Sequence, residues 1–241
     1  MSVVIVTGGS RGIGAEVCVQ AAESGYDVVV NYAGDASAAA SVASRVSSLG
    51  RQALTVQGDV SSESDVVALF DAASDLGPLY GLVNNAGVVG RAAPLVEQDV
   101  ATVRRVMDVN VTGVFLCCRE AVRRMTDGGA IVNVTSAAAR LGSAGEWVHY
   151  AASKAAVETM TFGLAQEVAA SGIRVNAVAP GLVNTSFHTT AGVPDRLDRL
   201  GPAQPMGRAG EPAEIAAAVL WLLSPAASYA TGATLPITGG R

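Results

Sequence analysis

Short apolar runs alternate along the chain with longer stretches of helical periodicity. Runs rich in valine and isoleucine are predicted to be strands, at 3–7, 27–32, 53–57, 79–84, 130–135 and 173–179. Helices are predicted to follow them, at 12–23, 36–49, 63–74, about 100–125, 149–170 and 211–223. The runs are apolar at successive positions, which is typical of strands buried on both faces. The pattern therefore predicts an α/β fold with parallel strands joined by helices.

This alternation is that of a single Rossmann-type, doubly wound parallel sheet of about seven strands, with helices on both faces. No proline- or serine-rich linker, block of charge or internal repeat divides the chain, so we predict one domain over residues 1–241. The least regular segment, about 184–210, is rich in threonine, glycine and proline. Loops of that length in a compact domain are usually functional, and we predict a substrate-binding loop there.

The charge balance of the chain excludes several kinds of partner. There are 16 lysine plus arginine residues against 21 aspartate plus glutamate, for a net charge of −5, and Lys154 is the only lysine. Without a basic excess or a basic run, we expect neither nucleic acid nor an anionic membrane as a partner. No apolar stretch approaches the roughly 20 residues of a membrane span, and no basic segment of a targeting signal is visible. We therefore expect a cytoplasmic protein.

The cysteines show no pattern of metal ligands. Cys18, Cys117 and Cys118 are three in number, two of them are neighbours, and only His149 and His188 could join them. A structural zinc site takes a full set of such ligands at a regular spacing. We expect reduced cysteines in the core and no metal site.

A glycine-rich turn connects the first predicted strand to the first predicted helix, with the spacing G-x-x-x-G-x-G. Glycine permits a positive φ and lets backbone N–H groups approach a phosphate at a helix N-terminus. A tight strand-to-helix connection alone would also explain these glycines. As a cofactor turn, the segment would bind through Gly8, Ser10, Arg11, Gly12, Ile13 and Gly14.

Tyr150 and Lys154 are four residues apart on a predicted helix, so the phenol and the ammonium project from one face. A phenol with its ordinary pKa of about 10 is a poor base at neutral pH, and a neighbouring ammonium favours the ionised form. Ser136 follows the strand at 130–135, which places a hydroxyl at the sheet edge where the glycine turn also lies. These three residues are candidate catalytic groups.

With these motifs in place, the chain resembles the single-domain short-chain dehydrogenases/reductases over about residues 3–240. It is most similar to the sugar (glucose 1-)dehydrogenase-like and 3-oxoacyl-ACP reductase-like branches. The resemblance identifies the glycine turn as the cofactor turn and Tyr150-x-x-x-Lys154 as the catalytic pair. It also implies cofactor contacts after the third, fourth and sixth predicted strands, at Asp59, Val60, Asn85, Ala86, Gly87, Pro180, Gly181, Val183 and Thr185.

The resemblance implies a catalytic tetrad of Asn110, Ser136, Tyr150 and Lys154. Tyr150 would exchange a proton with the substrate oxygen, and Ser136 would polarise that oxygen. Lys154 would lower the pKa of Tyr150, and both would lie at the nicotinamide ribose. Asn110 would interrupt its helix and hold a water that links Lys154 to solvent. The protein would then interconvert a secondary alcohol and a ketone or aldehyde by hydride transfer.

The second predicted strand gives the prediction of the cofactor. It ends at Asn31-Tyr-Ala, without the carboxylate that binds the adenosine ribose and repels a 2′-phosphate, and the next acid is Asp35. Asn31 itself is a candidate cofactor contact. Arg11 supplies a guanidinium suited to a phosphate. We therefore predict NADP(H) as the cofactor, with NAD(H) as the alternative.

The residues that would surround a substrate are less well indicated. Trp147 is either a pocket wall or an anchor of a subunit interface, and Glu146 is expected to be a solvated turn residue. His149 is next to Tyr150 in the sequence, and adjacent helix positions do not share a face, so we do not expect it to act in catalysis. Phe187 and His188, in the predicted substrate loop, are candidates to touch the substrate.

Several functions stay open on these residues. Two narrower activities are alternatives, the reduction of 3-oxoacyl-ACP and the dehydrogenation of a sugar. A non-catalytic nucleotide-sensing protein on the same fold is a third, which the complete tetrad disfavours. The predicted partner is a small-molecule carbonyl or alcohol substrate. The resemblance also implies a homo-oligomer, a tetramer or a dimer, since the family commonly packs its long helices against copies of themselves.

Overall fold

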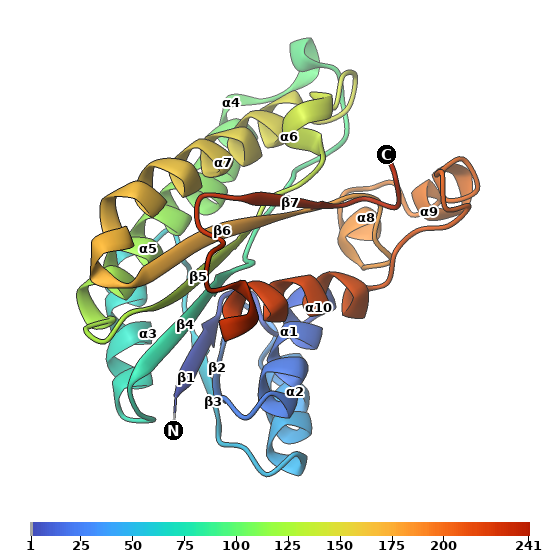
Figure 1. Cartoon of the computed structure of the whole chain (residues 1–241). Helices are drawn as coiled ribbons and strands as arrows, with labels where there is room; N and C mark the ends of the chain where they lie inside the picture. The colour runs from blue at the N-terminus through green and yellow to red at the C-terminus, as the bar shows by residue number, and fades with distance from the viewer. Residues whose placement is uncertain (1) are drawn as a thin grey trace.

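The structure, a computed structural model, describes residues 2–241 and places one parallel sheet between two layers of helices (Figure 1). The seven strands lie in the order β3-β2-β1-β4-β5-β6-β7. They are β1 (Val3–Val6), β2 (Asp27–Tyr32), β3 (Ala53–Gln57), β4 (Leu79–Asn84), β5 (Gly129–Val134), β6 (Ile173–Pro180) and β7 (Thr234–Ile237). All neighbouring pairs are parallel, which confirms the predicted doubly wound α/β fold.

Each face of the sheet is covered by its own helices. One layer holds α1 (Gly12–Glu23), α2 (Ala36–Ser48) and α10 (Pro212–Leu223), and the other holds α3 (Glu63–Ser74), α5 (Gly113–Arg124) and α7 (Val148–Val168) (Figure 1). Val4 packs in the core of the first layer and Ile5 in that of the second. Full burial of such a side chain stabilises the fold by about 1.5–3 kcal/mol. Side chains of successive strand residues point to opposite faces of the sheet, so they pack in opposite helix layers. This is why the strands are apolar at successive positions.

The shorter elements lie at the ends of the strands and in the loops. They are α4 (Val100–Met107), α6 (Ala138–Leu141), α8 (Phe187–Thr190), α9 (Arg196–Leu200), and the 3-10 turns Leu95–Glu97, Ala169–Ser171 and Pro225–Ala227. The predicted substrate loop therefore contains two short helices, α8 and α9. Within residues 2–241 no helix is long and apolar enough to span a membrane.

The sheet topology leaves a crevice at the carboxyl end of β1. The chain moves outward from β1 to β2 and β3, and then returns to place β4 on the other side of β1. The connections that leave β1 and β4 diverge at this point, so ligands of such sheets bind there. The glycine turn follows β1 and Asn85 follows β4, so both lie at this crevice.

The predicted helix over about 100–125 is interrupted. It consists of α4, a π-helical turn at Asp108–Thr112, and α5. Within the turn, the buried Asn110 side chain accepts from the Val88 N–H and donates to the Val88 carbonyl, both at 2.9 Å. The wider turn lets the Asn110 amide pair with a neighbouring backbone segment. The predicted interruption at Asn110 is confirmed, whereas a single continuous helix is wrong.

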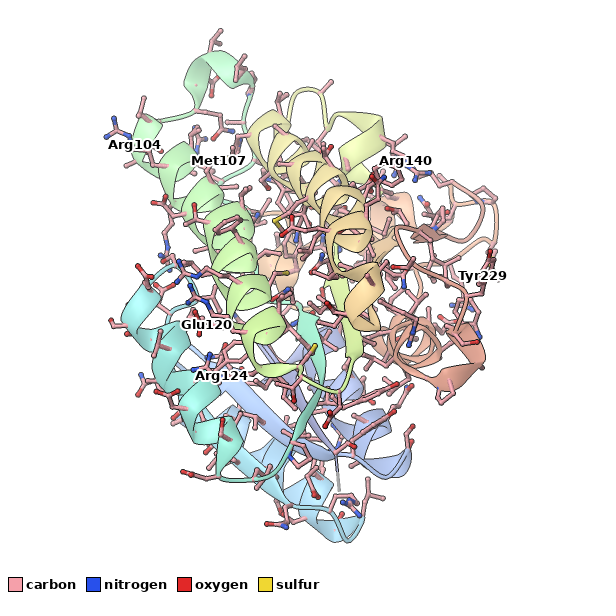
Figure 2. All side chains as sticks on the ribbon, turned by 60° about the vertical axis from the view of Figure 1, so that its left-hand side comes forward. Arg104, Met107, Glu120, Arg124, Arg140 and Tyr229 are labelled. Atoms are coloured by element: carbon pink, nitrogen blue, oxygen red, sulfur yellow. The ribbon has the colours of Figure 1, made fainter. Side chains whose placement is uncertain are left out.

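Ion pairs join α3 to α5 on one side of the molecule. The Glu120 carboxylate is buried between the guanidinium groups of Arg123 and Arg124, and Arg124 also pairs with Asp71 at 2.7 Å (Figure 2). Burial alone raises the pKa of Glu120, but hydrogen bonds from the two arginines outweigh it and lower the pKa overall. The paired charge thus stays ionised in an otherwise apolar layer. Beside it, Cys117 and Cys118 are free and buried, as is Cys18 under the opposite layer, which confirms the prediction of reduced core cysteines.

Candidate active site

The turn between β1 and α1 is held against the end of β4. The Asn85 side-chain amide donates to the carbonyls of Thr7 and Gly8, both at 3.0 Å, and Thr7 Oγ1 accepts from the Asn85 N–H. Gly8 has a φ of +61°. A Cβ on Gly14 would lie 2.4 Å from the Gly8 carbonyl oxygen, so no other residue fits there. The turn leaves the first residues of α1 at the cleft, and a helix N-terminus in that position favours phosphate.

A cleft of about 990 Å³ lies along this edge of the sheet, and it collects the predicted site residues from separate parts of the chain. Its lining includes Gly8, Ser10, Arg11, Gly12, Ile13, Asn31, Asp59, Val60, Asn85, Ala86, Gly87, Ser136, Tyr150, Lys154, Pro180, Gly181, Val183 and Thr185. Gly14 and Asn110 are the two predicted residues outside the lining. Both support it from behind, because Gly14 packs under the glycine turn and Asn110 is fully buried.

Tyr150 and Lys154 occupy successive turns of α7 at the cleft wall. Lys154 is only 4% exposed, and its Nζ donates to the Val134 carbonyl at 2.9 Å and lies 5.7 Å from the centre of the Tyr150 ring. Ser136 follows β5 and lines the same cleft. The shared helix face and the sheet edge thus bring the three predicted groups together.

Burial dominates the protonation of this pair. It raises the pKa of Tyr150 to about 12, although the hydrogen bond with Ser136 acts in the lowering direction. Burial also lowers the pKa of Lys154 to about 8, because desolvation penalises the ammonium. The resemblance implied that Lys154 lowers the pKa of Tyr150. In the structure burial governs that pKa and Ser136, not Lys154, is the group that opposes it, so near neutral pH the phenol holds its proton and is a proton donor.

Asn110 connects the π-helical turn to the catalytic helix. Besides its two bonds to Val88, its Nδ2 donates to Ser153 Oγ at 3.0 Å, and Ser153 is next to Lys154 on α7. A Cβ on Gly87 would approach both Asn110 Oδ1, at 3.4 Å, and Lys154 Nζ, at 3.5 Å. Gly87 therefore keeps open the space between these two side chains. The water-holding role of Asn110 stays a prediction.

The adenosine side of the cleft contains no free carboxylate at the end of β2. The buried Asn31 side chain accepts from the Gly8 N–H at 3.3 Å and donates to the Gly58 carbonyl at 3.1 Å, so it supports the turn from below. Asp35 caps α2 by accepting from the Ala38 N–H at 2.9 Å. Arg11 lines the cleft, and within residues 2–241 its guanidinium forms no ion pair. This side of the cleft therefore presents the Arg11 guanidinium together with the Asp35 side chain, which is turned to the N-terminus of α2.

Arg105 is a cleft residue that the sequence did not indicate. Its guanidinium contacts Asp59 at 2.7 Å and Ser61 Oγ at 2.8 Å, and it comes from α4, well separated from both along the chain. Burial alone raises the pKa of Asp59, but hydrogen bonds from Ser61 and Arg105 lower it overall. Asp59 is therefore held as a carboxylate at the rim of the cleft. Only the fold brings Arg105 to it, so no local sequence signal was available.

The other end of the cleft is lined by aromatic side chains. Phe187, in α8, lies 5.7 Å from the Tyr150 ring and 6.4 Å from the Trp147 ring, measured between ring centres. Trp147 is only 3% exposed, which confirms the pocket-wall interpretation over the interface anchor. His149 Nε2 bonds the Val89 carbonyl at 2.8 Å, so this side chain fixes the loop after β4. A short apolar wall thus stands beside Tyr150.

Glu146 is not the solvated residue that we expected. Its carboxylate pairs with Arg196 of α9, at the opposite side of the substrate loop. The two residues are 50 positions apart, so the loop fold, which the sequence did not predict, creates the pair. His188, also in this loop, is buried and hydrogen-bonded to the Val183 carbonyl at 3.1 Å, and burial lowers its pKa.

Known proteins are similar to this chain in both sequence and fold. A family model described as Enoyl-(Acyl carrier protein) reductase matches residues 8–241. The uncharacterized oxidoreductase YgfF of Escherichia coli (strain K12) is 48% identical over 247 residues, which cover 100% of this chain and 100% of that protein. The chain belongs to the short-chain dehydrogenase/reductase family. Like other short-chain dehydrogenases/reductases it is an NAD(P)-dependent oxidoreductase, which confirms the prediction of an enzyme over a non-catalytic sensor.

Two further family members are informative about ligands. The cis-4-hydroxycyclohexanecarboxylate dehydrogenase of Sinomonas cyclohexanicum is 45% identical over 243 residues, which cover 99% of this chain and 95% of that one. A short-chain dehydrogenase from Burkholderia cenocepacia, solved in complex with NADP, has a TM-score of 0.92 and 33% identity, and the match covers 98% of this chain and 96% of that one. Both matches therefore include nearly the whole chain, and with it the segments that line the cleft.

Proposed function

We propose that this short-chain dehydrogenase/reductase uses NADP(H) to interconvert a secondary alcohol and a ketone or aldehyde, with Tyr150 as the acid and base. The observation that carries the proposal is the Tyr150–Lys154 pair on α7, with Ser136 in the same cleft as the glycine turn. A nicotinamide cofactor bound there supplies or accepts the hydride. The protein supplies the proton and the position of the substrate.

Each residue of the tetrad has a stated task in this proposal. Tyr150 holds a proton at Oη near neutral pH, because burial raises its pKa to about 12, and in reduction it gives that proton to the carbonyl oxygen. Ser136 donates to the same oxygen and so stabilises the negative charge that develops there. Lys154 is the neighbouring ammonium, and it supplies Tyr150 with a new proton after the transfer. Asn110 fixes the π-helical turn, and this maintains the spacing between Lys154 and Gly87.

The choice of NADP(H) over NAD(H) rests on the adenosine side of the cleft. Asn31, which is uncharged, stands near the end of β2 and supports the turn, and Asp35 is turned to α2 as its cap, while Arg11 offers a guanidinium. The NADP complex of the Burkholderia cenocepacia relative supports the same choice. The residues present therefore fit NADP(H), with Arg11 as the residue that would hold its additional phosphate.

The wall beside Tyr150 favours an apolar substrate. Val89, Trp147 and Ala191 form a buried apolar cluster against which Tyr150 and Phe187 pack. Such a wall suits the carbon skeleton of a cyclic ketone or alcohol better than the hydroxyl groups of an aldose. The name of the Sinomonas cyclohexanicum relative, a hydroxycyclohexanecarboxylate dehydrogenase, supports a cyclic secondary alcohol. Reduction of a 3-oxoacyl thioester is the alternative within the family.

A substrate panel tests the proposal. Consumption of NADPH is followed with cyclic ketones, 3-oxoacyl thioesters and aldoses, and the Tyr150→Phe variant is the control. We expect the highest kcat/KM with a cyclic ketone, and a loss of kcat by a factor of about 10² or more in Tyr150→Phe, since one acid–base group contributes about 10²–10⁴. NADPH should still bind that variant, because the glycine turn and Arg11 are unaltered. Turnover that survives Tyr150→Phe would contradict the mechanism.

Self-association also belongs to the proposal. Met107 on α4 and Phe115 on α5 are 38% and 56% exposed on one side of the molecule, where Figure 2 labels Met107. These two exposed apolar side chains lie on the interrupted helix that the family commonly packs against a second copy of the chain. We expect two copies of the chain to cover it, in a dimer or tetramer. The mass in solution at micromolar concentration, from light scattering, checks this, and a monomer would contradict it.

A further inference from the structure

An ion pair joins the substrate loop to the segment that begins the catalytic helix. Arg196, in α9, pairs with the carboxylate of Glu146, which lies two residues before the start of α7. The guanidinium also lies 4.8 Å from the centre of the Trp147 ring, so it stacks on that indole. The Arg196 side chain is 12% exposed and that of Glu146 is 31% exposed. A pair this shielded is screened less by salt than a surface pair is, and its two contacts reinforce one another.

The same two segments meet again at the catalytic tyrosine. Phe187 of α8 packs between the rings of Trp147 and Tyr150. Ala191, which follows α8, is buried in the apolar cluster with Trp147. The base of the loop is fixed separately, by backbone bonds between Leu182 or Asn184 and Gly210. The position of the outer part of the loop, and with it the wall beside Tyr150, therefore depends on the contacts of Trp147 and Glu146.

We propose that the Glu146–Arg196 pair is a latch that holds the substrate loop against the start of α7 and thereby sets the affinity for apolar substrates. The inference rests on the proposed function. Breaking the latch moves Phe187 away from Tyr150, and an apolar substrate loses the wall against which its carbon skeleton packs. Tyr150, Lys154 and Ser136 are not part of the loop, so the proton transfer keeps its geometry. Glu146 and Arg196 are thus positioning residues that determine specificity.

Kinetics of single and double variants test the latch. In Glu146→Gln and in Arg196→Ala we expect the KM for cyclohexanone to rise about tenfold with kcat within about twofold, and the KM for glyceraldehyde, which is small and polar, to change less than about threefold. The double variant should be no worse than either single one, because residues that act as one unit are not additive. Multiplicative effects in the double variant, or equal rises in KM for both substrates, would overturn the latch.

Arg199→Ala is the matched control. Arg199 lies on the same helix and pairs with Asp195 at 3.7 Å, but this pair is exposed on both sides. Its removal should leave both KM values unchanged, because exposed pairs contribute little. A KM effect as large as that of Arg196→Ala would show that any loss of charge on α9 is enough, and would overturn the assignment to Arg196.

Hydrogen exchange tests the latch without any turnover. The Ala191 N–H bonds the Phe187 carbonyl at 2.9 Å, so backbone exchange over residues 187–200 reports the order of the loop. We expect faster exchange there in Glu146→Gln and Arg196→Ala, with the strands of the sheet and NADPH binding unchanged, which also shows that the variants fold. Unchanged exchange in the loop would overturn the latch. An enzyme that reduces no carbonyl would instead disprove the proposed function and leave this result valid.

Discussion

At the cofactor end of the cleft the turn is fixed by close backbone contacts and by hydrogen bonds to its backbone, whereas at the substrate end the wall is formed by packed side chains. The glycine turn fits because Gly14 meets the Gly8 carbonyl oxygen and Asn85 bonds two carbonyls of the turn. The wall beside Tyr150 comes from Trp147 and Phe187, which belong to segments 40 positions apart and touch only through their rings. The conformation of the cofactor end is therefore fixed by close contacts of the backbone, and that of the substrate end by the packing of side chains.

This difference decides what each end can tolerate. A backbone turn without space for a single Cβ cannot adapt, because carbonyl oxygens do not change rotamer. A wall of side chains can be altered one residue at a time, with modest cost to the fold. We expect changes at the first end to abolish cofactor binding, and changes at the second to alter substrate preference. Four predictions probe this contrast.

The largest effect is expected at Gly14. In Gly14→Ala the added methyl group would lie 2.4 Å from the Gly8 carbonyl oxygen and 2.5 Å from Asn85 Nδ2, so the turn must open. We expect NADPH affinity to fall by at least about 100-fold and the free energy of unfolding to fall by about 2–4 kcal/mol. Fluorescence titration with NADPH and urea denaturation measure the two. The matched control is Gly163→Ala in α7, where no atom lies within 4 Å, and which should stabilise the helix by about 0.5–1 kcal/mol.

The next effect concerns the pH dependence of reduction. It is determined by Tyr150 and Lys154, which lie between the cofactor end and the substrate end of the cleft. Lys154 has a pKa of about 8 in the folded protein, whereas Tyr150 at about 12 stays protonated throughout the accessible range. The ammonium that restores the proton to Tyr150 is therefore lost as the pH rises through about 8, and kcat/KM for reduction should fall by about tenfold per pH unit above it. Initial rates between pH 6 and roughly 10 measure this. A flat profile across that range would disprove the role of Lys154.

Stability should change in the opposite direction over that pH range, which separates titration of the site from unfolding. The pKa of Lys154 is lowered from 10.5 to about 8 by folding, so between these values the unfolded chain binds the additional proton. The free energy of unfolding therefore rises with pH as far as this group is concerned, and its penalty is fully present below about 8. The Lys154→Met variant should lose that rise.

The smallest effect is expected at Arg11, the one side chain at the backbone end that selects between cofactors. Arg11→Ala should weaken NADPH binding by about tenfold, since a charge-assisted contact is worth about 1.5–3 kcal/mol. NADH binding should be unchanged, because NADH has no 2′-phosphate. Dissociation constants for both cofactors measure the effect. Equal weakening of both would show that Arg11 acts on the turn and not on the phosphate.

The sheet and most helices could be predicted because their patterns are local. Apolar strands and capped amphipathic helices determine their own boundaries, and Glu63–Ser74 and Asp27–Tyr32 begin and end where the pattern predicts. The strand Thr234–Ile237 was not located, because it is short, half-exposed and contains Pro236, which an edge strand tolerates. The cofactor residues were predicted from motifs for the same reason, since each motif is a short local segment at the end of a predicted strand.

The side-chain pairs around the cleft could not be predicted, because they are formed between distant segments. Nothing near Glu146 indicates Arg196, and nothing near Asp59 indicates Arg105. The direction of the Tyr150 pKa was also missed, since it depends on burial, which spacing along a helix does not report. Motifs therefore identify which groups act, whereas the environment of those groups has to come from the fold.

Lys154 gives the protein a built-in reporter. It carries the only ε-amino group of the chain, and folding leaves it 4% exposed. A reagent that acylates amines should therefore leave this position unmodified in the native protein and modify it only when the cleft wall opens. The extent of labelling at Lys154, measured by mass spectrometry, would report how often the cleft wall opens, without any engineered probe.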